Sequence, residues 1–152
     1  MTRVYIMSIK PKYAKAVLEG RKVYELRRLQ GSKPLEEDSL VIVYASGNLQ
    51  SIIGEFRVGK VIVGSPEKIW ELVGRSEYGL DDEARRYIEG ARRAMAIQVR
   101  EPKIYNVKIE LSKIRRIIPG WNPPYSYAEL EEGDPLYELI VKRARITSSR
   151  RD

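Results

Sequence analysis

The stretch Gly20-Arg21-Lys22-Val23-Tyr24-Glu25-Leu26-Arg27 places charged side chains in a segment whose apolar residues alternate as in a β-strand. It comes directly after a predicted helix over 11–18, which a glycine terminates. A charged side chain that is removed from water needs a compensating partner. Charged residues on a strand beside a groove therefore indicate a functional role. The sequence therefore predicts functional side chains at Lys22, Glu25 and Arg27.

Outward from this stretch, apolar alternation and helix-capping residues predict a chain with many strands and few crossover helices. Glycines at 54 and 59 are predicted bulge sites, and such kinks let a sheet curl. We therefore predict the α+β class, with a curled mixed sheet or small β-barrel flanked by short helices. The predicted strands are 4–9, 22–28, 40–45, 52–63, 95–99 and 105–111, and the predicted helices begin at Pro11, Pro66, Asp81 or Asp82, and Pro135.

The length and composition predict one globular domain. The chain has 152 residues, and we assign 1–146 to a single domain and 147–152 to a flexible basic tail. It contains no cysteine and no histidine, which excludes disulfides, histidine-based catalytic dyads and zinc sites built on those ligands. No metal and no cofactor is predicted. We find no signal-peptide pattern and no apolar run near the ~20 residues of a membrane span, so a cytoplasmic protein without membrane contact is expected.

The net charge of +7 is unevenly distributed. Residues 1–33 contain nine Lys and Arg against two Glu, and residues 142–152 contain five against one Asp. A localised surface for a polyanion is one interpretation, and a generally charged, thermophile-like surface is the other. The basic run at 142–145 either contributes to polyanion binding or forms the solvated face of a terminal helix.

Several motifs together resemble the ASCH domain family of the PUA-like superfamily, in a stand-alone protein of archaeal type. Tyr125 stands where the family's late motif has Gln. The matching segments are Ser8–Tyr13, the pattern Gly20-x-Lys22-x-x-Glu25-x-Arg27, Gly90–Ile97, Glu101–Lys103 and Pro123–Tyr127.

The resemblance implies a PUA-like β-barrel and, for many members, RNA binding, with a possible role in regulation related to transcription or translation. It also implies enzyme activity in some members. A small bacterial branch deacylates acetylated cytidine with a threonine and a lysine, and a ribonuclease has been assigned elsewhere in the family. Glu25 stands at the threonine position here, so the nucleophile of that deacylating branch is missing.

The basic side chains of the motif suit phosphate. Arg27 offers a rigid fork for two oxygens and Lys22 a mobile point charge, while Lys10 and Lys12 would extend the positive field. Glu25 has three open roles: it accepts hydrogen bonds from a base edge, acts as a general base, or holds Lys22 or Arg27 in place.

Geometry sets a condition on this site. In a regular strand Glu25 and Arg27 share one face, whereas Lys22 points to the other. The three side chains converge only if the chain turns or bulges near Val23 and Tyr24.

Aromatic residues are candidates for stacking on unpaired bases, or else half-buried core residues. Tyr125 is the preferred stacker because Pro123-Pro124 would fix the loop that presents it, and Ser126 is a donor to phosphate or substrate, or else a turn residue. The other tyrosines considered are Tyr13, Tyr24, Tyr44 and Tyr127. The predicted binding set is Lys10, Lys12, Lys22, Tyr24, Glu25, Arg27, Tyr125 and Ser126.

Three functions remain open from sequence. The favoured one is RNA binding, in which an open groove lined by Lys22, Glu25 and Arg27 takes single-stranded RNA or a modified nucleotide. The second is a hydrolase, a ribonuclease or amidohydrolase, that acts on RNA or a nucleoside with Lys22 and Glu25 as catalytic groups. The third is a module that binds a nucleotide-like small ligand or a protein. The sequence does not determine the oligomeric state.

Overall fold

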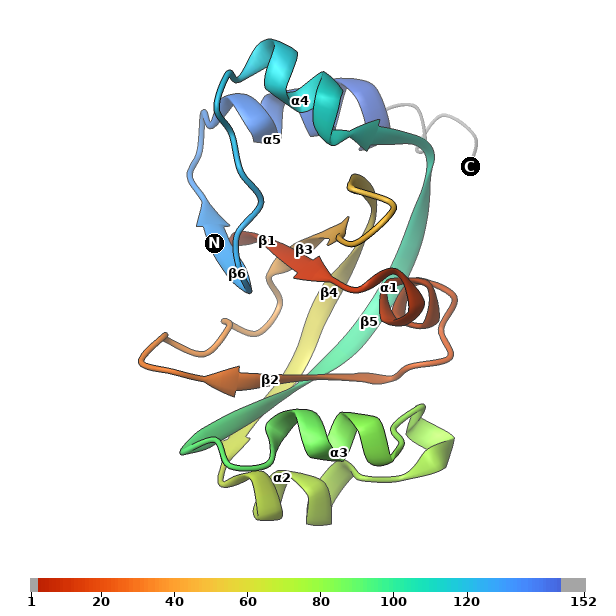
Figure 1. The fold of residues 1–152 in the computed structure, drawn as a ribbon, viewed down its shortest axis with the longest axis vertical. Coiled ribbons are helices and arrows are strands. Elements are labelled where there is room, and N and C mark those ends of the chain that lie inside the picture. The colour runs from red at the N-terminus through yellow and green to blue at the C-terminus, as the bar shows by residue number, and fades with distance from the viewer. Residues whose placement is uncertain (1–2, 146–152) are drawn as a thin grey trace.

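The computed structural model describes residues 3–145, which form a six-stranded mixed sheet that curls on itself (Figure 1). The sheet order is β2-β5-β4-β3-β1-β6, with β1 and β3 parallel and the other neighbours antiparallel. The predicted α+β class and curled sheet are confirmed. The strands are β1 (Val4–Ile9), β2 (Tyr24–Leu29), β3 (Leu40–Ala45), β4 (Ser51–Gly64), β5 (Arg93–Glu110) and β6 (Tyr127–Leu130).

Short helices cover the ends of the curled sheet. Figure 1 shows α2 and α3 at one end of the molecule, α4 and α5 at the other, and α1 beside the middle. Ser65 and Asp134 cap two of them, accepting hydrogen bonds from the backbone N–H groups of Lys68 and Leu136. The helices are α1 (Pro11–Leu18), α2 (Pro66–Val73), α3 (Asp82–Ile88), α4 (Leu111–Ile117) and α5 (Pro135–Ile140), with short helical turns at Ser76–Tyr78 and Val141–Arg145.

Bulges give the two longest strands their bend. The pairing of β4 with β5 shifts register between Ile52 and Gly54 and again between Val58 and Val61, around the predicted glycines. A Cβ on Gly54 would lie 2.4 Å from the carbonyl oxygen of Lys103. Gly54 therefore lets the two strands cross closely enough for the sheet to curl.

The structure differs from the prediction in three elements. The strands predicted at 95–99 and 105–111 are one continuous strand, β5. The strand bends at Glu101, which has a φ of 47°, and pairs with β4 on both sides of the bend. Helix α4 was not predicted, since its seven residues carry a short apolar pattern. Strand β6 was not predicted, but it pairs antiparallel with β1.

The apolar core lies on both faces of the sheet. On the inner face, alternate residues of β1 and β3 pack against α1 together with Met95 and Ile97 of β5. On the outer face, the intervening residues of β1 and β3 pack against α4 and α5, while α2 and α3 cover β2 and the start of β5. Glu25 and Arg27 pair with Ile97 and Met95 across the β2–β5 ladder, so both charges lie on the inner face.

Candidate functional site

The charged groups of Lys22, Glu25 and Arg27 meet at one point inside the curled sheet. The Lys22 ammonium donates to Oε1 of Glu25 over 2.7 Å, and Nε of Arg27 donates to Oε2 over 2.8 Å. A terminal guanidinium nitrogen of Arg27 also lies 2.7 Å from Oε2. One carboxylate thus holds two cations, and we call these three residues the ion cluster.

Lys22 reaches the cluster because it lies in the turn before β2. The backbone N–H groups of Arg21 and Lys22 both donate to the carbonyl of Ala16, and the strand begins only at Tyr24. Val23 donates to the carbonyl of Tyr78, which leads the chain into the strand. The turn required near Val23 and Tyr24 is therefore confirmed.

Arg27 connects the cluster to β1 and to the loop before β6. Its Nη2 donates to the carbonyl of Ser8 over 2.8 Å, and its Nη1 donates to Oγ of Ser126 over 3.2 Å. The Ser8 hydroxyl donates to the carbonyl of Pro124 over 2.6 Å, which ties the Pro-Pro loop to the same point. The late motif and the Lys22–Arg27 motif, nearly a hundred residues apart, are adjacent in the fold.

The ion cluster is closed in this structure. The three residues are only 3–6% exposed, and they bond to one another. The expected open groove against them is therefore not present here. Two surface hollows lie elsewhere, and neither is lined by a member of the cluster.

The electrostatics of the cluster keep Glu25 ionised. Burial alone would raise the pKa of the Glu25 carboxyl, but the charges of Lys22 and Arg27 and their hydrogen bonds hold that pKa below its ordinary value. With two cations and one carboxylate, the cluster carries one positive charge in excess. That excess suits an anionic ligand.

Tyr13 of α1 covers the cluster. The Lys22 ammonium lies 4.7 Å from the centre of its ring, within the range of a cation–π contact. The Tyr13 hydroxyl donates to Glu83 of α3, and burial together with this bond raises the pKa of Tyr13. The sequence offered Tyr13 as a possible stacker or a half-buried core residue. It did not indicate the contact with Glu83, which depends on how α3 lies relative to α1.

The exposed members of the predicted set surround this closed centre. Lys10 and Lys12 are exposed on either side of Pro11, and Lys12 lies 3.5 Å from Glu83. Tyr125 is fully exposed beside the Arg27 ligand Ser126. These residues are available to a ligand without a change in the core.

Three other tyrosines are engaged within the protein. Tyr24 is half-buried with its ring 5.4 Å from that of Tyr78, so the structure does not bring it to the cluster. Tyr44, considered for stacking, is 1% exposed and packs against Trp121, so that reading is wrong. Tyr127 donates to the carbonyl of Lys33.

A second buried carboxylate was missed. Glu55 of β4 accepts from the Tyr105 hydroxyl over 2.8 Å and from Nε of Arg145 over 2.6 Å. Arg145, considered as a polyanion ligand or a solvated residue, instead anchors the terminal helical turn to the outer face of the sheet. The available signal was a glutamate in the stretch Ile52–Phe56 of β4, whose other residues are apolar or glycine. The predicted tail, 147–152, lies outside the described residues.

Among residues 3–145, no group of three or more Asp or Glu side chains is placed to hold a metal ion. Over the same range, no helix combines the length and apolar character needed to cross a bilayer.

No protein-family model matches the chain. A protein of Zymomonas mobilis named "ASCH domain-containing ribonuclease" is 30% identical over 137 residues, which cover 88% of this chain and 90% of that protein.

Solved structures agree in fold. The crystal structure of ASCH from Zymomonas mobilis has a TM-score of 0.78 at 24% identity and covers 93% of this chain and 96% of its own. The N-terminal domain of Staphylothermus marinus McrB has a TM-score of 0.58 at 15% identity, covering 94% of this chain and 95% of its own. Three of the predicted motifs, Ser8–Tyr13, Gly20–Arg27 and Pro123–Tyr127, meet around the ion cluster. The identity to the Zymomonas protein over nearly the whole of both chains shows that this chain belongs to the ASCH domain family.

Proposed function

We propose that this protein binds RNA, as single strands or at a modified nucleotide, beside the point inside the curled sheet where Lys22, Glu25 and Arg27 meet. The observation that carries the proposal is the excess positive charge of the ion cluster, which places two cations on one carboxylate beside the loop of Tyr125. The chain's net charge of +7 and a relative named as a ribonuclease support it. The protein acts in the cytoplasm, in regulation related to transcription or translation.

Binding begins at the exposed residues. Lys10 and Lys12 attract the phosphate backbone, and Tyr125 stacks on an unpaired base, a contact worth ~1–3 kcal/mol per base. Movement of the Tyr13 ring then opens the cluster, and a phosphate or a nucleotide-like ligand takes the place that the ring held over Lys22. Glu25 keeps the two cations in position throughout.

A ribonuclease function is the second candidate, favoured by the printed name of the Zymomonas relative. Lys22 and Glu25 would be its catalytic groups. A general base works best with a pKa near the working pH, whereas the pKa of Glu25 lies below its ordinary value. This electrostatic setting favours an orienting role for Glu25 over a catalytic one.

One experiment tests both functions. A 5′-labelled single-stranded RNA is titrated with protein at several salt concentrations, binding is read by fluorescence anisotropy, and the same samples are run on a denaturing gel. We expect affinity that falls steeply with salt while the RNA stays intact. Shortened RNA that appears with wild type but not with Lys22→Met or Glu25→Gln would instead establish the ribonuclease.

Matched variants locate the binding surface. Lys22→Met removes the excess charge and keeps the Glu25–Arg27 pair, so we expect the slope of log K against log salt to fall by about 0.7, the value for one phosphate on a single strand. The double variant of Lys10 and Lys12 to Ala should lower affinity more than a double variant at Lys60 and Lys108, two exposed lysines elsewhere. Equal affinity in all variants would place RNA on another surface, and no binding at physiological salt would overturn the proposed function.

A further inference from the structure

The guanidinium group of Arg28 has an unused donor. Its Nη2 donates to the carbonyl of Glu89 over 2.7 Å, which fixes the head at the end of β2. Its Nε is buried and has no acceptor among the residues that the structure describes. A buried polar group without a partner costs about 1–3 kcal/mol, and more when it is charged. Such a group indicates an acceptor that residues 3–145 do not supply.

Arg28 lines a hollow at the edge of the sheet. The volume of this hollow is about 410 Å³, within the ~300–1,000 Å³ that is typical of ligand pockets. It has two arginines and an amide side chain in its wall and no carboxylate. We call it the Arg28–Arg92 hollow, and its lining residues are Arg28, Leu29, Gln30, Gly31, Gly90, Ala91 and Arg92.

The fold holds the two sides of this hollow together. Leu29 at the end of β2 pairs with Arg93 at the start of β5, so the turn after β2 lies beside the turn between α3 and β5 (Figure 1). Gly31 and Gly90 line it with φ of +85° and +79°, a conformation that glycine adopts without strain. A Cβ on Gly90 would lie 3.8 Å from Nη2 of Arg28, so the backbone passes close to the guanidinium group.

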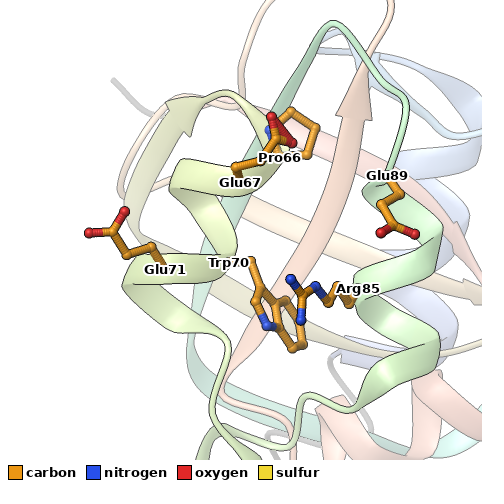
Figure 2. A pocket seen from close by; sticks show the side chains of 6 residues that line it. All are labelled: Pro66, Glu67, Trp70, Glu71, Arg85 and Glu89. Carbon is orange, nitrogen blue, oxygen red and sulfur yellow. The ribbon is translucent and has the colours of Figure 1, made fainter.

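A neighbouring hollow has the opposite charge and contains one arginine of its own. It lies between α2 and α3, has a volume of about 250 Å³, and is lined by Glu67, Glu71 and Glu89 together with Trp70 (Figure 2). Arg85 lies over the Trp70 ring at 5.7 Å and supplies a cation from within the protein. The Arg28–Arg92 hollow has no such internal counter-charge in its wall.

We propose that the Arg28–Arg92 hollow binds one phosphate group of an RNA strand, an inference that rests on the proposed function. Guanidinium groups match the geometry of phosphate oxygens, and a phosphate oxygen supplies the acceptor that Nε of Arg28 lacks. Because Nε is buried from solvent, the guanidinium group of Arg28 rotates slightly about its hydrogen bond to the Glu89 carbonyl when the phosphate enters. Arg92, which is exposed, provides the second fork.

The first test uses inorganic phosphate and needs no RNA. Arginine Nε–Hε signals are followed by ¹⁵N-resolved NMR while phosphate replaces chloride at constant ionic strength. We expect a saturable shift of the Arg28 signal, with affinity weakened about tenfold in Arg92→Ala, as for the loss of one charge-assisted hydrogen bond. Arg116→Ala, an exposed arginine on α4 at the opposite end of the molecule, should behave as wild type. An Arg28 signal that ignores phosphate would overturn the proposal and assign the missing acceptor to water.

The second test separates this inference from the proposed function. In the RNA titration, Arg92→Ala and Arg28→Lys should each lower the salt slope by about 0.7, whereas Arg116→Ala should not. Wild type that binds RNA with unchanged slopes in both hollow variants would overturn the inference and leave the proposed function standing. Wild type that fails to bind RNA would overturn the proposed function and, with it, the assignment of this phosphate to RNA. The phosphate titration would then decide whether the hollow binds anions at all. If Arg28→Lys does not fold, the salt slope of the Arg92→Ala variant alone decides the test.

Discussion

Arg27 donates to the backbone carbonyl of Ser8 over 2.8 Å, and this bond joins β2 at one end of the sheet order to β1 near the other. The two strands are not neighbours in the sheet. Side chains, rather than a backbone ladder, thus hold the curled sheet closed at this point. The predictions below follow from this arrangement and from the ion cluster that completes it.

Arg27→Lys should destabilise the protein although it keeps the charge. Lysine cannot donate at once to Glu25, to the carbonyl of Ser8 and to Ser126, so we expect a loss of about 1.5–3 kcal/mol in the free energy of unfolding. Urea denaturation monitored by circular dichroism measures it, with Arg116→Lys as the control. Equal midpoints for the two variants would show that the fork of Arg27 contributes nothing.

The residues of the ion cluster should differ in how much each of them stabilises the folded protein. Glu25→Gln leaves two buried cations without a counter-charge and should cost about 3–5 kcal/mol, as for breaking a buried ion pair. Lys22→Met keeps the Glu25–Arg27 pair in an apolar setting and should cost less, about 1–2 kcal/mol. Thermal and urea unfolding of both variants test the order. The reverse order would contradict the excess positive charge that we assign to the cluster.

Stability should fall in acid because of Glu25. Its pKa in the folded protein lies below the ordinary value of 4.5, so the stability it contributes is fully present above that value and is lost as pH falls through the folded pKa. The difference in unfolding free energy between wild type and Glu25→Gln should therefore be constant near neutrality and shrink below about pH 4.5. Glu71→Gln, a change at an exposed glutamate of α2 outside the cluster, is the control. A difference independent of pH would mean that Glu25 is not an ionised partner of the two cations.

Removing the Tyr13 ring should expose Lys22. In Tyr13→Ala the ammonium loses its cover, so an amine-acetylating reagent should modify Lys22 faster than in wild type, as read by mass spectrometry of the tryptic peptides. Tyr13→Phe keeps the ring but loses the bond to Glu83, and should give an intermediate rate. Tyr87→Ala, a change at an exposed tyrosine on α3, serves as the control. Identical labelling of Lys22 in all four proteins would show that Tyr13 does not cover it.

Gly54→Ala should disturb the crossing of β4 and β5. The new methyl group would lie 2.4 Å from the Lys103 carbonyl and 2.7 Å from a methyl of Leu18, so we expect a cost of about 1–3 kcal/mol or more. Gly64→Ala on the same strand meets nothing nearer than 3.7 Å and should be tolerated. Calorimetric melting temperatures compare the two. A tolerated Gly54→Ala would mean that the strands can separate at the bulge without loss.

Local sequence signals predicted the elements whose cause is local. The caps at Ser65 and Asp134, the glycine stop after α1 and the apolar strands at 4–9 and 40–45 all appear where expected. Each depends on neighbouring residues in the chain, through a capping bond, a positive φ or alternation.

Elements that depend on distant partners were missed. Glu101-Pro102 signals a turn, yet pairing on both sides carries β5 through it. Strand β6 is stabilised by β1 rather than by its own pattern. The sequence singled out Lys22 and Arg27 as site residues, which stays a prediction. Their closure on Glu25 under Tyr13 depends on the packing of α1, which no local pattern encodes.

The sealing of β2 against β1 by side chains alone has a dynamic consequence. A backbone ladder opens only when several peptide hydrogen bonds break together. The contact between β2 and β1 instead depends on a few polar side-chain groups, whose hydrogen bonds water or an anion can replace one at a time. We therefore expect β2 and β1 to separate locally before the rest of the domain unfolds. We therefore expect a ligand to enter the domain between β2 and β1, where the fold opens most easily.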